Sequence, residues 1–211
     1  MRAGPRRGRR RNLPPRPHPL PGGPVQHLRA ARRRPPARAA PADPGDVTAV
    51  TVRRVGGEDW CTLKAVRLRA LAADPAAFTS TLAREEAFTD AVWQERAVAG
   101  RSFVACRADA VVGLVSYYAE DGRPRERQLV SMWVAPEARR SGVARALVEA
   151  VLDAAAAEGA ERLTLFVVHD NEAARRLYEQ LGFVATGEVQ ELPPDALRSE
   201  ARYALPLPSA T

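Results

Sequence analysis

The sequence predicts a mixed α/β fold that combines an antiparallel group of strands with a βαβ unit. Three strand-like runs follow one another over residues 102–136, separated only by polar, turn-like residues, and the first two are close enough to form a hairpin. The pattern then changes to alternating helix and strand over residues 143–181. Such alternation is typical of parallel strands joined by a crossover helix. The expected order is therefore β-α-α-β-β-β-α-β-α-β-β.

The first elements are a strand and two helices. Residues 48–55 alternate between apolar and polar side chains, as expected for a strand with one buried face. Apolar residues then recur at helical spacing from Trp60 to Leu71, and Asp74-Pro75 should end that helix. A second helix is expected over residues 89–100, with a threonine N-cap at its start and a glycine at its end.

The later elements include two helices with one apolar face each. The helix predicted over residues 143–157 carries an apolar stripe that suits packing on a sheet. After a strand at residues 162–168, Asp170 or Asn171 can cap a helix over residues 172–181, and Gly182 can close it in a left-handed conformation. A final pair of strands is expected around residues 183–192 and 201–207.

The N-terminal segment differs in composition from the rest of the chain. Residues 1–45 hold 12 of the 32 Lys and Arg residues but one of the 25 Asp and Glu residues. This segment therefore has a net charge of +11 and the rest of the chain −4, which together give the net charge of +7. It is rich in Arg, Pro, Gly and Ala and lacks apolar periodicity, which predicts disorder. It could be a basic arm for nucleic acid or an acidic partner. We favour the alternative that it has no role, because translation could begin further in, for example at Val47 or Val50. The folded domain is expected over residues 50–207.

Composition also narrows the class of protein. The apolar runs are strand-sized, so we expect no membrane span, and the N-terminus has no apolar region typical of a secretory signal. Cys61 and Cys106 lie far apart without ligand-like spacing, and we interpret them as small buried residues in a reducing cytoplasm, with no metal site. The domain itself is mildly acidic, which argues against a nucleic-acid-binding surface on it.

A candidate anion site lies where the helix at 143–157 begins. Residues 139–145 read RRSGVAR, which puts three arginines at the positive end of a helix dipole. Gly142 leaves room for a ligand, and the backbone N–H groups that follow it have no partner within the helix. These donors, the dipole and the arginines together suit a phosphate. The plainer alternative is a basic, solvent-facing helix start.

Tyr178 is the second candidate residue. It belongs to the inward stripe of the helix at 172–181, together with Ala174, Leu177 and Leu181. A buried phenol requires a hydrogen-bond partner and can donate a proton. A core tyrosine whose hydroxyl reaches the surface is the structural alternative.

The two segments together resemble the GNAT family of N-acetyltransferases. Residues 139–144 match the family's Arg/Gln-x-x-Gly-x-Gly/Ala signature, with Ala144 where many members have glycine. Asn171-x-x-Ala174-x-x-x-Tyr178, followed by Leu-Gly-Phe at 181–183, resembles the second conserved block. The resemblance covers about residues 50–207. It implies a central mixed, largely antiparallel sheet with helices on both faces.

The resemblance also implies acetyl-CoA as co-substrate and assigns residues to it. The CoA pyrophosphate would bind at Arg139, Arg140, Ser141, Gly142, Val143, Ala144 and Arg145. Pantetheine would lie against the strand at Met132 and Val134, where a backbone N–H would polarise the acetyl carbonyl. Asn171 would contact the cofactor, and Tyr178 would be the general acid that protonates the departing thiolate.

The acceptor remains open between a small-molecule amine and a protein amine. Residues 67–89 are expected to line its pocket. A base must remove the amine proton, but Glu85, Glu86, Glu120 and Asp121 have no motif around them, and we interpret them as solvated surface. Two other classes of function remain, an acyl-CoA-binding module without turnover and a nucleic-acid-associated protein acting through its tail. A cytoplasmic location is expected, and a homodimer is possible.

Overall fold

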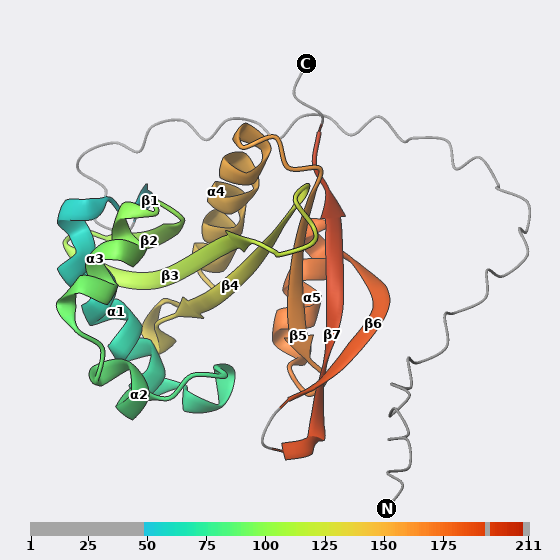
Figure 1. The fold of residues 1–211 in the computed structure, drawn as a ribbon, viewed down its shortest axis with the longest axis horizontal. Helices are drawn as coiled ribbons and strands as arrows, with labels where there is room; N and C mark the ends of the chain where they lie inside the picture. The colour runs from blue at the N-terminus through green and yellow to red at the C-terminus, as the bar shows by residue number, and fades with distance from the viewer. Residues whose placement is uncertain (1–48, 193–194, 209–211) are drawn as a thin grey trace, which may run out of the picture. The chain divides into compact units, whose positions relative to one another are not determined.

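The computed structural model describes residues 49–192 and 195–208, and its centre is a seven-stranded sheet with the order β1-β2-β3-β4-β5-β7-β6 (Figure 1). Antiparallel neighbours make up the first part, from β1 to β4, and the last part, from β5 through β7 to β6. The strands β4 and β5 form the one parallel pair of the described sheet. This mixed, mostly antiparallel sheet confirms the predicted fold class. The strands are β1 (Val50–Arg54), β2 (Ser102–Arg107), β3 (Ala110–Ala119), β4 (Glu126–Val134), β5 (Arg162–Val168), β6 (Val184–Leu192) and β7 (Asp195–Pro206).

Helices cover both faces of this sheet (Figure 1). Gly113 of β3 faces Leu147 of α4, whereas the Trp133 ring of β4 lies on the other face beneath Arg69 of α1. The α-helices are α1 (Trp60–Ala73), α2 (Leu82–Glu86), α3 (Asp90–Val98), α4 (Val143–Ala157) and α5 (Glu172–Leu181). Short 3₁₀ turns are η1 (Gly57–Asp59), η2 (Pro75–Ala77) and η3 (Pro136–Ala138). The five-residue helix α2 was not predicted, because it is too short to show periodicity.

Several helix ends are where the sequence predicted them. Helix α1 stops at Ala73, directly before Asp74-Pro75. Asn171 caps α5, since its side-chain oxygen accepts the Ala174 N–H at 3.0 Å, and Gly182 ends that helix with a φ of 95°. Thr89 occupies the N-cap position of α3, but its side chain makes no capping hydrogen bond.

The predictions about the two cysteines and about the N-terminal tail have different outcomes from those about the helix ends. The burial predicted for Cys61 is wrong: it is exposed, because it lies on the outward side of the first turn of α1. Cys106 is partly buried, and both thiols are free. The tail at residues 1–45, predicted to be disordered, lies outside the described residues.

A buried charge cluster joins β7 to the other strands. Arg202 is 1% exposed, and its guanidinium donates to Glu120 at 2.5 Å and to Glu126 at 3.0 Å. It also contacts Glu188 of β6 at 3.4 Å and Thr164 of β5 at 3.2 Å. The arginine therefore holds the end of β3 and the start of β4 against β5, β6 and β7. A buried charge is tolerated only when it is paired in this way.

Candidate functional site

The parallel pair β4–β5 separates along its length, and a cavity of about 980 Å³ occupies the region beyond the last pairing. Pairing runs from Glu126↔Arg162 to Gln128↔Thr164 and includes no later residue of either strand. The unpaired stretches, residues 129–134 of β4 and 165–168 of β5, both line the cavity. Its volume suits a small-molecule ligand or cofactor. Backbone groups in these stretches that no strand has paired are available to that ligand.

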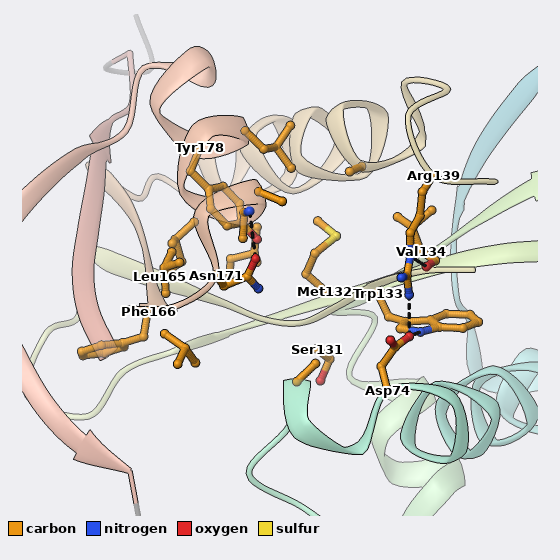
Figure 2. A pocket seen from close by; sticks show the side chains of 18 of the residues that line it. Asp74, Ser131, Met132, Trp133, Val134, Arg139, Leu165, Phe166, Asn171 and Tyr178 are labelled. Atoms are coloured by element: carbon orange, nitrogen blue, oxygen red, sulfur yellow. Dashed lines mark hydrogen bonds and ion pairs between the residues drawn. The ribbon is translucent and has the colours of Figure 1, made fainter. Parts of the chain in front are cut away.

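A β-bulge in β4 redirects the backbone at this cavity. Leu114↔Trp133 and Ser116↔Val130 are the flanking pairs, so Ser131 and Met132 together stand opposite the single residue Val115 of β3. Ser131 also has a positive φ of 56°, which is uncommon for a residue other than glycine. Bulges of this kind interrupt the ladder and re-aim the chain next to functional sites. Figure 2 shows Ser131 and Met132 at the cavity.

The backbone of Val134 is directed toward the same gap. The Ala135 N–H donates to the Val112 carbonyl at 2.9 Å, and antiparallel pairs alternate between hydrogen-bonded and non-hydrogen-bonded. Gly113↔Val134 is therefore a non-hydrogen-bonded pair, and the N–H and C=O of Val134 point away from β3. Arg139 already binds that carbonyl through Nε at 3.0 Å. The Val134 N–H is therefore the backbone group of this residue that is free to donate into the gap.

The start of α4 lies at one end of the cavity and has no acidic residue in its first turn. Its N-cap is Gly142, which has a φ of 85° and makes no side-chain cap. An added Cβ at Gly142 would meet no atom within 4 Å, so the glycine is required by its backbone conformation and not by protein packing. The backbone N–H groups of residues 143–145, in the first turn of α4, have no partner within the helix. Arg140 and Arg145 line the cavity beside them. Free N–H groups, a helix dipole and arginines at one helix N-terminus are an arrangement that suits an anion.

Arg139 has a different environment from Arg140. Its Nη2 contacts Asp74 at 2.6 Å, and the same carboxylate oxygen accepts the Trp133 Nε1–H at 2.7 Å (Figure 2). Asp74 directly follows α1, so these contacts connect the end of α1 to β4 and to the loop before α4. Arg139 lines the cavity, but its charge is already paired. The sequence showed Asp74 only as a helix stop.

Two motif residues face away from the cavity. The Ser141 hydroxyl donates to the Ala138 carbonyl and accepts from Arg107, both at 2.7 Å. Val143 is 1% exposed and packs into the core. Neither side chain lines the cavity, so any contact with a ligand would come from the backbone. The predicted site residues that do line it are Met132, Val134, Arg139, Arg140, Gly142, Ala144, Arg145, Asn171 and Tyr178.

Tyr178 is buried at the side of the cavity that α5 provides. It is 5% exposed, and its ring packs edge-on against Phe183 at 5.6 Å. Among the described residues its hydroxyl has no hydrogen-bond partner, although it belongs to the cavity wall. Burial raises the pKa of this phenol above its ordinary value. Tyr178 is therefore neutral at physiological pH and has a proton to donate into the cavity.

The four acids weighed as bases do not line the cavity. Glu85 was interpreted as solvated surface, which is wrong: it is 2% exposed and paired with Arg67 at 2.7 Å. Burial alone would raise the pKa of the Glu85 carboxyl, but hydrogen bonds and charge from Arg67 outweigh it and the pKa is lowered. Glu120 belongs to the Arg202 cluster. Glu86 and Asp121 are exposed, as expected.

Sequence reasoning gave no role to Phe166 and Glu200, which both line the cavity. Phe166 belongs to β5 and Glu200 to β7. A further aromatic residue of the wall, Phe78, directly follows η2. Phe78 lies within residues 67–89, the stretch expected to line the acceptor pocket, and Asp74, Ala76 and Ala77 of that stretch also line the cavity. Glu200 had no motif around it, and only the strand order brings it here. Phe166 pairs with Arg202 and has that guanidinium over its ring, so it lies on the face of the sheet that α5 does not cover.

The part of the chain that the structure describes contains neither a membrane-spanning helix nor a cluster of metal-ligating side chains. Across residues 49–192 and 195–208, no helix combines the length and apolarity needed to span a membrane. The same residues contain no group of three or more His, Cys, Asp and Glu side chains placed to hold a metal ion.

The fold and the cavity together bring a helix N-terminus with two arginines and a buried phenol to the point where the parallel pair β4–β5 separates. The sequence model of the Acetyltransferase (GNAT) family matches residues 67–183, and the chain belongs to this family. The family uses acetyl-CoA. None of the curated proteins compared with the chain matches its sequence.

Solved structures share this fold at low sequence identity. An N-acetyltransferase from Staphylococcus aureus Mu50 has a TM-score of 0.62 at 20% identity, over 76% of this chain and 100% of its own. A GNAT-family acetyltransferase from Streptococcus pneumoniae has a TM-score of 0.63 at 22% identity, again over 76% and 100%. The Salmonella typhimurium protein yncA, described as an acetyltransferase and solved with its cofactor acetyl-CoA, has a TM-score of 0.61 at 19% identity, over 78% and 97%.

Proposed function

We propose that this protein is an acetyl-CoA-dependent N-acetyltransferase that transfers the acetyl group directly to a primary amine. One observation carries the proposal. A single cavity, at the point where β4 and β5 separate, contains both an uncapped helix N-terminus and a buried phenol without a protein partner. Family membership supports the same chemistry. The catalytic domain of the proposal extends over residues 50–207.

The residues present fit acetyl-CoA. Its pyrophosphate matches the start of α4, where Gly142 leaves open space and the N–H groups of residues 143–145 are free for an anion. Arg140 and Arg145 supply positive charge there, and Arg140 has no ion pair with any described residue. The pantetheine arm matches the gap beside β4, where the Val134 N–H can donate to it. Asn171 lines the cavity at the start of α5.

Bound acetyl-CoA supplies the acetyl group as a thioester, and the residues of the cavity have separate tasks in its transfer. A backbone N–H at the bulge of residues 131–132 donates to the acetyl oxygen and so draws electron density from the carbonyl carbon. The amine nitrogen bonds to that carbon as the carbon–sulfur bond breaks. Tyr178 gives its phenolic proton to the departing sulfur. The amine must be neutral to attack, so an acceptor that binds as an ammonium first gives one proton to solvent or to a base. After attack the nitrogen loses one further proton in the same way, and Tyr178 regains its proton from solvent.

Arg139 has a positioning role in this proposal. Its contacts with Asp74 and Val134 hold the loop before α4 against the end of β4. The loop is thereby fixed relative to the strand that binds pantetheine. Ser141 adds to this by holding Ala138 and Arg107.

The test is an acceptor screen with the full-length protein. Acetyl-CoA is mixed with small primary amines and with peptides that have free α- or ε-amines, and released thiol and acetylated product are both measured. Thiol release that depends on an amine, with a matching gain of one acetyl group by mass spectrometry, supports the proposal. Binding of acetyl-CoA by calorimetry without product from any amine would indicate the alternative, a binding module without turnover. The cytoplasmic location and a possible homodimer stay predictions.

A further inference from the structure

The cavity extends to both faces of the sheet, and the cofactor residues account for only one end. The start of α4 and the residues of α5 lie on the face that those two helices cover. The other end is lined by Asp74 and residues 76–78, which follow α1 on the opposite face. An amine that attacks the acetyl carbon must enter from this second end, because the first is taken by CoA in the proposed function.

Glu200 of β7 lines the cavity and lies on the face of that second end. It pairs with Val168 in the sheet, and directly opposed residues of an antiparallel pair point to the same face. Side chains along a strand alternate between the two faces of the sheet. Glu200 is three residues from Tyr203, which lies on the face covered by α4 and α5, so Glu200 points to the opposite face. Arg202, two residues from Glu200, points to the same face as Glu200. Val168 and the bulge residue Met132 each lie four residues beyond the last pair of β4 and β5, Gln128↔Thr164. Glu200 therefore borders the unpaired stretch of β5, two strands from β4 and its bulge.

The Glu200 carboxylate is not neutralised by a cation of the described chain. Its partner is the side-chain amide of Gln190, which donates from Nε2 at 2.5 Å and is uncharged. Of the other acids in the cavity wall, Asp74 is paired with Arg139, and Asp170 is exposed at the cofactor side beyond β5. A half-buried carboxylate without a counter-ion attracts a cationic ligand.

Two phenylalanine rings complete this end of the cavity. Phe78 has the Arg67 guanidinium at 4.5 Å from its ring centre, and Phe166 has that of Arg202 at 5.6 Å. Both arginines are themselves buried and fixed by carboxylates. Their charges are therefore already balanced, and the rings offer apolar, immobilised walls beside Glu200.

We propose that Glu200, oriented by Gln190, binds the ammonium group of the acceptor, and that the acceptor is a primary amine with an aryl or other apolar group packed between Phe78 and Phe166. This proposal rests on the proposed function and names its substrate class. It makes Glu200 a specificity-determining residue. The amine could belong to a free small molecule or to a peptide N-terminus, because both present the same ammonium next to an apolar group.

Binding without turnover tests the proposal. The full-length protein is saturated with CoA, which carries no acetyl group, and titrated with 2-phenylethylamine or with 2-phenylethanol, a neutral molecule of similar shape. We expect the ammonium to bind about tenfold more tightly than the alcohol, the advantage of one charge-assisted contact. Glu200→Gln should abolish this preference, and Glu200→Asp should restore part of it. The matched control is Glu191→Gln, which removes the same charge from an exposed residue of β6 outside the cavity and should leave the preference intact.

The outcomes distinguish a failure of the Glu200 assignment from a failure of the proposed acetyltransferase function. If CoA binds but neither probe does, or if Glu200→Gln keeps the preference for the ammonium, the assignment of Glu200 is wrong while the acetyltransferase function stands. If CoA itself does not bind, both are wrong. A third titration, with the dipeptide amide Phe-Gly, identifies the source of the amine. Tighter binding than 2-phenylethylamine indicates a peptide N-terminus, and weaker binding indicates a free amine.

Discussion

Replacement of Tyr178 by phenylalanine is the most direct test of the proton donor. The change removes one hydroxyl and keeps the ring that packs against Phe183. Because the hydroxyl has no partner among the described residues, its loss breaks no hydrogen bond of the fold, and we expect the free energy of unfolding to change by less than about 1 kcal/mol. The departing thiolate, by contrast, loses its acid. We expect turnover to fall roughly 100-fold, which is about 2.7 kcal/mol in the barrier.

The assay for Tyr178→Phe needs three measurements on one variant. Turnover is followed by thiol release with an accepted amine, acetyl-CoA affinity by calorimetry, and stability by urea denaturation. Tyr203→Phe is the matched control: Tyr203 is also a buried tyrosine, at 6% exposure, but it does not line the cavity, and its variant should keep near-normal turnover. Turnover of Tyr178→Phe within about threefold of the unmodified protein would refute the role of this phenol as acid.

Three further perturbations test other parts of the site. Gly142→Glu puts a negative charge at the proposed anion site and should weaken acetyl-CoA binding by at least about 2 kcal/mol. The control is Gly122→Glu in the turn between β3 and β4, where the φ of 77° gives comparable backbone strain and binding should be normal. Equal affinities in the two variants would contradict the anion site. Asp74→Ala leaves the buried Trp133 Nε1–H without its acceptor and should cost about 1–3 kcal/mol in urea denaturation. Asp74→Asn keeps an acceptor and should cost less; since both variants lose the ion pair with Arg139, equal costs would show that this ion pair, and not the Trp133 hydrogen bond, stabilises the site. Deletion of residues 1–45 should leave melting temperature and turnover unchanged, because the described residues of the cavity wall lie between Asp74 and Glu200; a large drop in either would assign the tail a role in the domain.

Local features of the site could be predicted because neighbours in sequence determine them. The N-cap of α5 at Asn171, the left-handed Gly182 and the glycine before α4 depend on residues within one helical turn. The burial of Tyr178 follows from its place in the inward stripe of α5. Each of these is a property of a single helix, so the periodicity and the capping residues of that helix are enough to predict it.

Features that depend on distant residues could not be predicted. Glu85 reads as a surface acid until its partner Arg67, on another helix, is known. Asp74 and Arg139 are 65 residues apart, and nothing in either segment indicates their contact. Glu200 reaches the cavity because β7 lies next to β5, an insertion between β5 and β6 that the order of elements does not reveal. The bulge at Ser131 likewise depends on the register between two strands.

The position of β7 between β5 and β6 also affects how the protein folds during synthesis (Figure 1). Strands β1 to β5 can pair as they emerge, but β5 then has one open edge until β7 has been made. The segment from α5 through β6 must be held beside an incomplete sheet during this interval. Open strand edges attract other chains, and intermediates of this kind are prone to aggregate. Newly made chains that lack β7 should therefore depend on chaperones more than chains truncated within the segment before β1.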